Sequence, residues 1–186
     1  FIALQLPAEE SRLLVEYYNR LFLLYFIVMN NKNYRKGVGI IVVNSKGEFF
    51  LGKRIGAEAW QFPQGGIDEG ESTEEALFRE LHEETGLIKS KVSILAVSSK
   101  WLVYHIPHVF QRSNKKYDGA MQKWYLLQLT GTNNDINLNA VNHAEFDAWK
   151  WANKETAINN VIRFKKSVYE SILAEFSDVL ERFKYD

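Results

Sequence analysis

The sequence has 186 residues, of which 46% are hydrophobic and 25% charged, values typical of one globular domain. Basic and acidic residues balance at 23 each, so no overall charge favours DNA or a membrane surface, and a polyanion must be bound by a local patch. The absence of cysteine excludes disulfides and thiolate metal sites and is consistent with a cytoplasmic protein.

The first 28 residues differ in character from the rest. The most apolar run, LFLLYFIVM (Leu21–Met29), is too short to span a bilayer, which takes about 20 residues, so no membrane partner is expected. Apolar residues before Met29 recur at helical spacing, and the polar stretch NNKNYRKG follows Met29 directly. We hypothesise that residues 1–28 are an upstream, helix-like extension and that the functional domain spans residues 29–186.

The next segments alternate between strand and turn signals. Val38–Val43 and Glu48–Arg54 are rich in β-branched and apolar residues, and the turn residues Asn44–Gly47 between them predict a β-hairpin. Ala59–Gly66 (AWQFPQGG) ends in a proline and paired glycines, which predicts a strand tip entering a loop.

The clearest helix signals lie in GESTEEALFRELHEETG, residues 70–86. Ser72 and Glu75 form an S-x-x-E capping box at its start. Gly86 stands where a left-handed C′ residue would end the helix.

Strand signals return in the second half of the chain, and a helix ends it. Segments rich in β-branched and aromatic residues are predicted strands: Ser93–Pro107, Lys123–Gly131 and Glu145–Trp151. The polar stretch Gln111–Gln122 is predicted to be a loop. From about Glu155, helical spacing predicts a long amphipathic terminal helix with a break near Arg163. The pattern indicates a mixed sheet with helices against it, α/β or α+β.

Three glutamates of the predicted helix, Glu80, Glu83 and Glu84, lie beside its apolar stripe, within an arc of roughly 100°. Like charges at this spacing repel by roughly 0.2–0.5 kcal/mol per pair. Arg79 can pair with Glu83, but no base within the helix serves Glu80 or Glu84. Two interpretations stay open from the helix alone: a solvated acidic face with bases nearby, or a site for a hard divalent cation.

The spacing around these glutamates matches a known signature. The positions Gly65, Glu71, Arg79–Leu81, Glu83–Glu84 and Gly86–Leu87 complete the pattern G-x5-E-x7-R-E-U-x-E-E-x-G-U, where U is apolar. The chain therefore resembles the Nudix hydrolases. The segments YRKGVGIIVVN, WQFPQGGIDEGES, KWYLLQL, EFDAWKW and RFKKSVY resemble the bacterial RNA pyrophosphohydrolase branch, which is close to the dinucleoside-polyphosphate hydrolases.

This second resemblance covers about Tyr34 to Phe183. Two departures stand out. Residues 111–122 do not follow the branch's substrate loop, and His143-Ala144 precede Glu145 where relatives often have a proline.

The resemblance implies a Nudix-type α/β/α sandwich with a mixed sheet, a loop–helix–loop box and a long C-terminal helix. It implies that Mg²⁺ or Mn²⁺, more than one ion with substrate bound, is held by Glu80, Glu83, Glu84 and Glu145. Glu80, or a neighbouring carboxylate such as Glu84, would activate the attacking water, and Arg79 would orient that carboxylate. Gly65, Glu71 and Gly86 would have structural roles. The alternatives are an exposed strand-edge charge for Glu145, a helix salt bridge for Arg79 and a plain turn for Gly65.

Basic and aromatic residues outside the box are candidates for substrate binding: Arg35, Arg54, Lys123, Phe164 and Lys165. By resemblance, Arg35 and Phe164 would hold the 5′-terminal base between them, and Lys165 would reach a phosphate. The alternatives are core packing for Phe164 and simple solvation for the lysines.

The resemblance supports three functional hypotheses. The first is an RNA 5′-pyrophosphohydrolase that converts 5′-triphosphate or diphosphate ends to monophosphate and so promotes mRNA decay. The second is a dinucleoside-polyphosphate hydrolase. The third is a non-catalytic RNA-binding module, which would be expected to have lost box glutamates, and none is missing here. The expected partner is thus 5′-phosphorylated RNA or a dinucleoside polyphosphate.

Overall fold

The chain divides into two compact units, residues 1–33 and 34–186, and the fold below is that of the second. The computed structural model describes residues 33–110 and 117–183. The predicted apolar helix before Met29 and the predicted domain start lie outside the described residues. Within them, no helix is long and apolar enough to cross a membrane.

The described residues form an eight-stranded mixed sheet whose central path runs β3-β2-β1-β7-β5. β1 and β7 are parallel, and the other pairs are antiparallel. β4 also pairs with β1, β6 with β7 and β8 with β2. The strands are β1 Tyr34–Val43, β2 Phe49–Arg54, β3 Trp60–Gln61, β4 Gln64–Gly66, β5 Val92–Val97, β6 Leu102–His105, β7 Gly119–Leu129 and β8 Phe146–Ala152.

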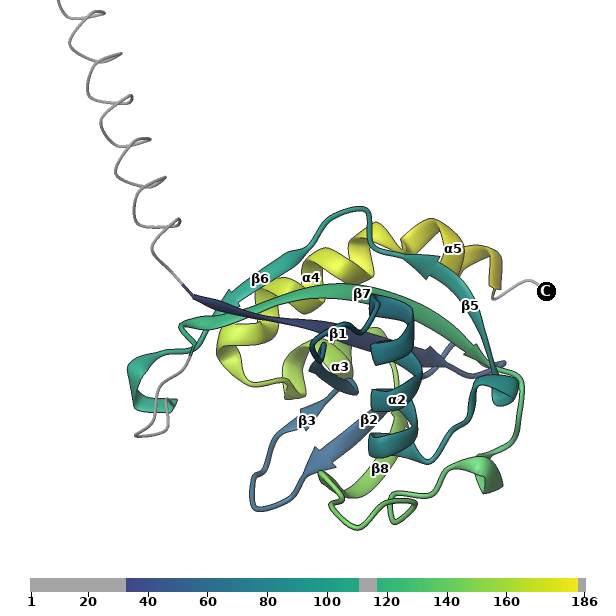
Figure 1. Ribbon diagram of the computed structural model, residues 1–186. Coiled ribbons are helices and arrows are strands. Elements are labelled where there is room, and N and C mark those ends of the chain that lie inside the picture. The colour runs from purple at the N-terminus through teal and green to yellow at the C-terminus, as the bar shows by residue number, and fades with distance from the viewer. Residues whose placement is uncertain (1–32, 111–116, 184–186) are drawn as a thin grey trace, which may run out of the picture. The chain divides into compact units, whose positions relative to one another are not determined.

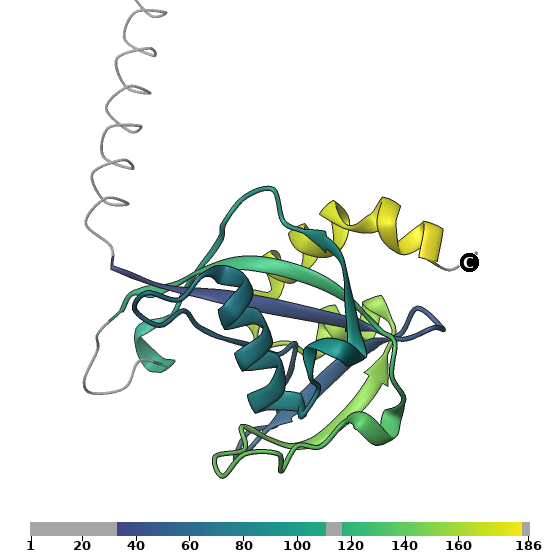
Figure 2. The ribbon, with the colours of Figure 1, turned by 45° about the vertical axis from the view of Figure 1, so that its right-hand side comes forward.

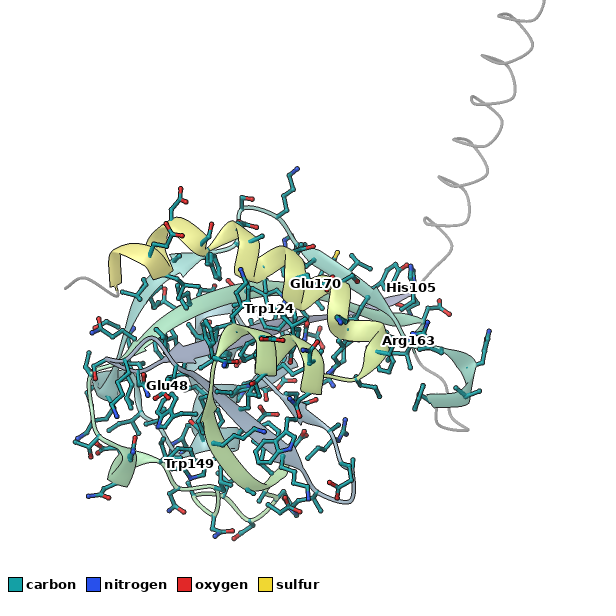
Figure 3. The ribbon with its side chains drawn as sticks, turned by 180° about the vertical axis from the view of Figure 1, so that it is seen from behind. Glu48, His105, Trp124, Trp149, Arg163 and Glu170 are labelled. Carbon is teal, nitrogen blue, oxygen red and sulfur yellow. The ribbon has the colours of Figure 1, made fainter. Side chains whose placement is uncertain are left out.

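Helices cover both faces of this sheet, as the sandwich prediction required. α2 (Thr73–Thr85) lies in front of the sheet in Figures 1 and 2. The other face carries α3 (Lys154–Asn160), α4 (Lys166–Glu175) and α5 (Ser177–Phe183). Seen from behind, α4 crosses the sheet over Trp124, whose ring centroid lies 5.6 Å from that of Tyr169 in α4 (Figure 3). The α/β/α arrangement is confirmed.

The core has two halves because central strands are buried on both faces. Along β1, Val38, Ile40 and Val42 pack in one cluster with Leu77 and Leu81 of α2. The alternate residues Ile41 and Val43 pack in the other cluster with the helices of the opposite face. A near-continuous apolar run such as VGIIVV is what a strand covered on both sides requires.

The helix signals of the box are confirmed in detail. The Ser72 side chain accepts from the backbone N–H of Glu75, and the Glu75 side chain accepts from the backbone N–H of Ser72. At the other end Gly86 adopts φ 74°, and its N–H donates to the carbonyl of His82. Both ends of α2 are therefore fixed by local sequence.

The strands of the predicted hairpin pair only next to the turn. β1 and β2 pair at a single register point, Val43↔Phe49, because β4 lies along β1 at Gly37–Gly39. Gly65–Gly66 therefore belong to a strand, and their prediction as loop residues was wrong. A Cβ on Gly37 would meet the carbonyl oxygen of Gly65 at 2.3 Å, so the two backbones approach closely only because residue 37 has no side chain.

Two further predictions are refined. β7 begins at Gly119, so the end of the predicted loop Gln111–Gln122 is strand, while residues 111–116 lie outside the described residues. The predicted strand Ser93–Pro107 is divided into β5 and β6. The terminal helix is broken as expected near Arg163, by the 3₁₀ turn Arg163–Lys165, and again between α4 and α5.

The capping box gives a stability prediction. Ser72→Ala removes the acceptor for the Glu75 N–H, and we expect a loss of about 1 kcal/mol in the free energy of unfolding. Thermal unfolding followed by circular dichroism measures it. Ser90→Ala, at an exposed serine in a short 3₁₀ turn, is the matched control and should change little. An equal, small effect of both substitutions would show that the cap contributes nothing.

Candidate active site

The carboxylate of Glu84 is the most deeply buried charge of α2. Glu84 is only 3% exposed, and its Oε2 accepts the backbone N–H of Gln64 at 2.8 Å. Its Oε1 has no hydrogen-bond partner within residues 33–110 and 117–183. Leaving a buried carboxylate oxygen unpaired is costly, so this atom fits a cation better than it fits the core.

Glu80 lies one turn earlier and is 9% exposed. Its Oε1 accepts from Nη1 of Arg79 at 2.8 Å. The inference that no base within the helix serves Glu80 was therefore wrong, because the long arginine side chain folds back over its neighbour. The helix also tilts these glutamates further inward than the predicted rim position: Glu80 and Glu84 are buried, whereas the Glu83 side chain keeps 44% exposure.

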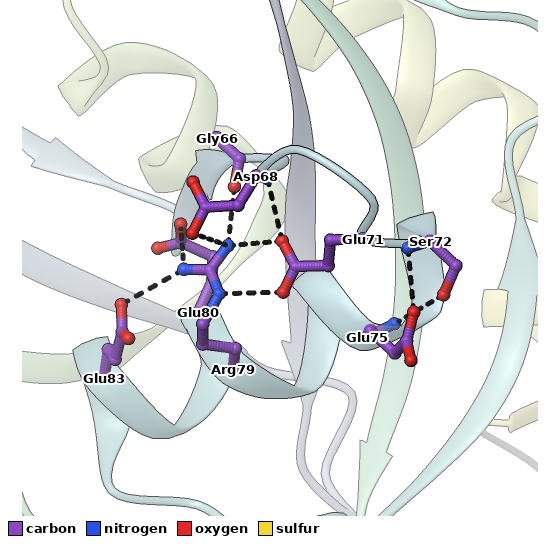
Figure 4. A network of polar contacts seen from close by, with 8 residues as sticks. All are labelled: Gly66, Asp68, Glu71, Ser72, Glu75, Arg79, Glu80 and Glu83. Carbon is purple, nitrogen blue, oxygen red and sulfur yellow. Dashed lines mark hydrogen bonds and ion pairs between the residues drawn. The ribbon is translucent and has the colours of Figure 1, made fainter.

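Arg79 connects the box loop to the helix (Figure 4). Its Nε and Nη2 donate to the two carboxylate oxygens of Glu71 at 2.8 and 2.7 Å, and Nη2 also donates to the carbonyl of Gly66 at 2.7 Å. Nη1 reaches Glu83 at 3.3 Å as well as Glu80. The hydrogen bond from Arg79 lowers the pKa of Glu71. Glu71 thus stays ionised and holds the loop through Arg79.

All four predicted metal ligands line one cavity. Glu80, Glu83, Glu84 and Glu145 surround it together with Val141 and His143. Burial raises the pKa of Glu84 well above its ordinary value, and the nearby charge of Glu145 adds to this. Burial also raises the pKa of Glu80, although Arg79 opposes it. Glu80 and Glu84 therefore resist ionisation while no cation is bound.

This donor set fits a hard divalent cation. It offers carboxylate oxygens, which Mg²⁺ and Mn²⁺ prefer, and one of them is buried and unpartnered. In the side-chain conformations of the described residues, no three carboxylates or histidines already converge on one point. Glu80 and Glu83 are instead turned toward Arg79, so the cation would have to compete with the guanidinium for them.

A second cavity adjoins the first and shares Glu80 and Glu145 with it. Much of its wall carries basic, amide or hydroxyl groups, from Arg35, Lys36, Arg54, Gln61, Gln64, Tyr104 and Gln122. The backbone N–H of Ile55 donates to the carbonyl of Glu145 at 3.0 Å, which fixes the start of β8 against the end of β2. This contact places Arg54 and Glu145 on neighbouring strand ends.

The structure brings together some of the predicted substrate residues. Arg35 and Arg54 line the second cavity. Lys165 lies behind its wall, 5% exposed, and its Nζ donates to Oε1 of Gln61 at 3.2 Å and lies 5.3 Å from the ring centroid of Tyr104. Burial, helped by the charge of Arg54, lowers the pKa of Lys165 to about 8.

Two of the predicted substrate residues lie elsewhere. Phe164 packs against Tyr104 and Phe110, with ring centroids 5.8 and 5.5 Å away, and does not line the second cavity. Lys123 donates to the carbonyl of Ser99 at 3.3 Å and lines neither cavity.

Sequence reasoning gave no side-chain role to five polar residues of the second cavity: Lys36, Gln61, Gln64, Tyr104 and Gln122. Gln61 and Gln64 stand in WQFPQGG, so their place in a shared motif was an available signal. For Gln122 the sequence offered no comparable signal. It is 2% exposed, its Nε2 donates to Oε1 of Gln64 at 3.4 Å, and its own Oε1 has no partner within the described part of the chain.

Comparison with known proteins agrees with this geometry. The family model described as NUDIX domain matches residues 33–174. A curated protein of Shewanella denitrificans named RNA pyrophosphohydrolase is 43% identical over 159 residues, which cover 84% of this chain and 92% of that protein.

Solved structures share the fold at lower identity. A binary complex of a C. elegans Ap4A hydrolase superposes with a TM-score of 0.58 at 23% identity, covering 77% of this chain and 98% of that chain. The E. coli dihydroneopterin triphosphate pyrophosphohydrolase gives a TM-score of 0.62 at 17% identity, covering 77% of this chain and 99% of that chain. These two likenesses concern the fold.

The buried Glu84 gives a prediction on stability and pH. Because its pKa in the folded protein exceeds the ordinary 4.5, the folded state binds more protons than the unfolded state between pH 4.5 and that raised pKa. This stabilising effect of the proton is complete below pH 4.5 and is lost as pH rises through the raised pKa. Without metal, Glu84→Gln should therefore raise the thermal midpoint at pH 7.5.

The gain should shrink as the pH is lowered from 7.5 toward 4.5, because Glu84 in the parent protein takes up its proton as the pH falls through the raised pKa. Differential scanning calorimetry in chelating buffer measures both midpoints. Glu83→Gln, on the same helix but half exposed, is the control and should change the midpoint little at either pH. A Glu84→Gln protein less stable than the parent at pH 7.5 would contradict the prediction.

Proposed function

Because the chain belongs to the Nudix family of hydrolases, we propose that it is a metal-dependent RNA 5′-pyrophosphohydrolase. It would convert 5′-triphosphate or diphosphate RNA ends to 5′-monophosphate and so promote mRNA decay in the cytoplasm. The observation that carries the proposal is the pair of adjoining cavities, one acidic and one basic, that share Glu80 and Glu145. The relative named RNA pyrophosphohydrolase, 43% identical, supports RNA as the substrate.

The acidic cavity supplies the reaction centre. Glu80, Glu83, Glu84 and Glu145 would hold the divalent ion, Mg²⁺ or Mn²⁺, which neutralises polyphosphate charge and lowers the pKa of bound water. Arg79 fixes Oε1 of Glu80 at 2.8 Å, so the carboxylate is held at a defined angle beside the cavity. Glu80 would then orient the attacking water and accept its proton, with Glu84 as the neighbouring carboxylate.

The basic cavity supplies the contacts to the substrate. Arg35 and Arg54 would bind the polyphosphate, since both line this cavity and a guanidinium matches phosphate geometry in a bidentate manner. Lys165 would add positive charge from behind the wall. A role for Phe164 in holding the terminal base stays a prediction, since its ring packs with Tyr104 and Phe110 and does not line this cavity. Lys123 has no part in this proposal, because it lines neither cavity.

A dinucleoside polyphosphate would meet the same two cavities, since it too carries anhydride-linked phosphates, and it is the second candidate substrate. The motif WQFPQGG, which contributes Gln61 and Gln64 to the cavity wall, is common to both branches by resemblance. A non-catalytic RNA-binding module remains the third candidate. It is disfavoured because every box glutamate is present and gathered around one cavity.

The substrate comparison tests the proposal directly. At equal enzyme and Mg²⁺ concentration, kcat/KM should be higher for 5′-triphosphorylated RNA than for diadenosine tetraphosphate. Release of phosphate or pyrophosphate measures the first reaction, and chromatography of the nucleotides measures the second. A preference for diadenosine tetraphosphate would replace RNA by the second candidate. Turnover of neither, with RNA still bound, would favour the non-catalytic module.

Glu80→Gln tests the role of that carboxylate. We expect kcat to fall by roughly 10²-fold or more, because the amide cannot accept a proton and is a poorer cation ligand. The fold should persist, and relief of like-charge repulsion should leave the thermal midpoint equal or slightly higher. Glu74→Gln is the matched control, an exposed glutamate of the same helix that pairs only with Lys89 at the surface. A Glu80→Gln enzyme of near-normal turnover would refute the assignment.

A further inference from the structure

The adjacent glycines of β4 lie under two different functional side chains. A Cβ added to Gly65 would fall 1.8 Å from Cδ of Glu80 and about as close to its two oxygens. A Cβ added to Gly66 would fall 2.1 Å from Nη2 and 2.4 Å from Nε of Arg35. Successive residues of a strand face opposite sides, so the pair separates the two partners.

Strand pairing explains why Arg35 reaches this position. Gly37 of β1 pairs with Gly66 of β4 in antiparallel register. Arg35 lies two residues before Gly37 on the same face of β1, which makes it the diagonal neighbour of Gly66. A long side chain at a diagonal position can cross the partner residue, provided that the partner presents no side chain of its own.

The glycine at 66 is not explained by its backbone conformation. Positive φ values occur at Gly47, Gly56, Gly70 and Gly86, and Gly66 is not among them. Alanine is therefore acceptable to the backbone at this position. The groups that a methyl would meet first are the Nη2, Nε and Cζ atoms of the Arg35 guanidinium, the end of an exposed and flexible side chain.

We propose that Gly66 is a positioning residue for Arg35: its bare α-carbon lets the guanidinium lie in the wall of the basic cavity, where it meets the polyphosphate of the substrate. Gly65 does the same for Glu80 on the other side of the strand. The inference rests on the proposed function in one respect, that Arg35 binds substrate. It adds that the two glycines serve different steps, Gly66 the binding of substrate and Gly65 the chemistry.

The neighbouring strand offers a structural contrast. A Cβ on Gly37 would meet the backbone carbonyl of Gly65, which cannot turn aside without breaking the β1–β4 pairing. The three atoms nearest to a methyl at Gly66 all belong to the Arg35 side chain, which can swing into solvent. Gly66→Ala should therefore fold with a thermal midpoint near that of the parent, whereas Gly37→Ala should be clearly destabilised.

The test is a double-mutant cycle between Gly66→Ala and Arg35→Ala. The substrate is 5′-triphosphorylated RNA in Mg²⁺, and the affinity probe is the same RNA with a methylene-bridged triphosphate that cannot be hydrolysed. Each single variant should raise KM and the Kd of the probe by about tenfold or more, the effect of losing one charge-assisted hydrogen bond. kcat should stay within about twofold of the parent value.

The double variant decides whether Gly66 acts through Arg35. It should match Arg35→Ala alone, because the methyl has nothing left to displace. Losses that multiply, an unchanged KM in Gly66→Ala, or a fall in kcat alone would each overturn the inference. Gly65→Ala should show the opposite signature, a loss of kcat through Glu80; if that variant does not fold, the Gly66–Arg35 cycle still gives the answer.

Failure of the proposed function can be told apart from failure of this inference. If the parent protein does not hydrolyse triphosphorylated RNA, the proposed function is wrong. The same cycle is then measured as Kd for a methylene-bridged analogue of diadenosine tetraphosphate. Non-additive losses there would keep Gly66 as the positioning residue, and additive losses would reject it.

Discussion

The buried, half-satisfied carboxylate of Glu84 is the constraint around which the site is built. One of its oxygens accepts the Gln64 N–H at 2.8 Å, and the other has no partner in the described part of the chain. A core would normally expel such a group or pair it. Here α2 is fixed at both ends by local caps, so the helix cannot turn to release Glu84 without losing Leu77 and Leu81 from the core. The fold therefore carries this cost while no cation is bound.

Arg79 pairs with the box glutamates other than Glu84. One guanidinium serves Glu71, Glu80, Glu83 and the Gly66 carbonyl, so the box loop and the helix share a single cation. This arrangement leaves Glu84 as the box glutamate that Arg79 does not reach, and its Oε1 has no hydrogen-bond partner among the described residues. The negative charge that Arg79 does not neutralise is thus concentrated where the acidic cavity opens, between α2 and the start of β8.

The sequence predicted the local features well and the long-range ones less well. The capping box, the C′ glycine and the gathering of Glu80, Glu83 and Glu84 follow from spacing within short segments or from the box signature, whereas Glu145 was predicted from the resemblance of EFDAWKW. Helix spacing alone missed the contact of Arg79 with Glu80, which the resemblance implied, because adjacent helix residues do not normally face each other. Gln122 and Lys123 show the other limit, since which of two neighbouring strand residues faces a cavity depends on register.

Strand register also determines where Arg35 lies, because Arg35 crosses Gly66 as its diagonal neighbour. Its sandwich with Phe164 around a terminal base stays a prediction from the resemblance, and Phe164 packs with Tyr104 and Phe110. The pairing of Gly37 with Gly66, on which that crossing depends, joins residues that only the folded sheet brings together. A sequence motif predicts where the glycines stand. The side chain that lies over each glycine follows only from the pairing of β1 with β4.

A polyphosphate bound across the two adjoining cavities would meet basic side chains in one and carboxylates in the other. Phosphates placed directly against Glu80 and Glu145 would face like charges, an interaction of about 4 kcal/mol per pair at 4 Å near a protein surface. Arg35 and Arg54 can neutralise the phosphates on one side, but they line the basic cavity, whereas Glu84 lines the acidic one. A second source of positive charge must therefore stand between the phosphates and the carboxylates. In the proposed mechanism a divalent cation at the buried oxygen of Glu84 would meet this requirement and leave Arg35 and Arg54 to the substrate.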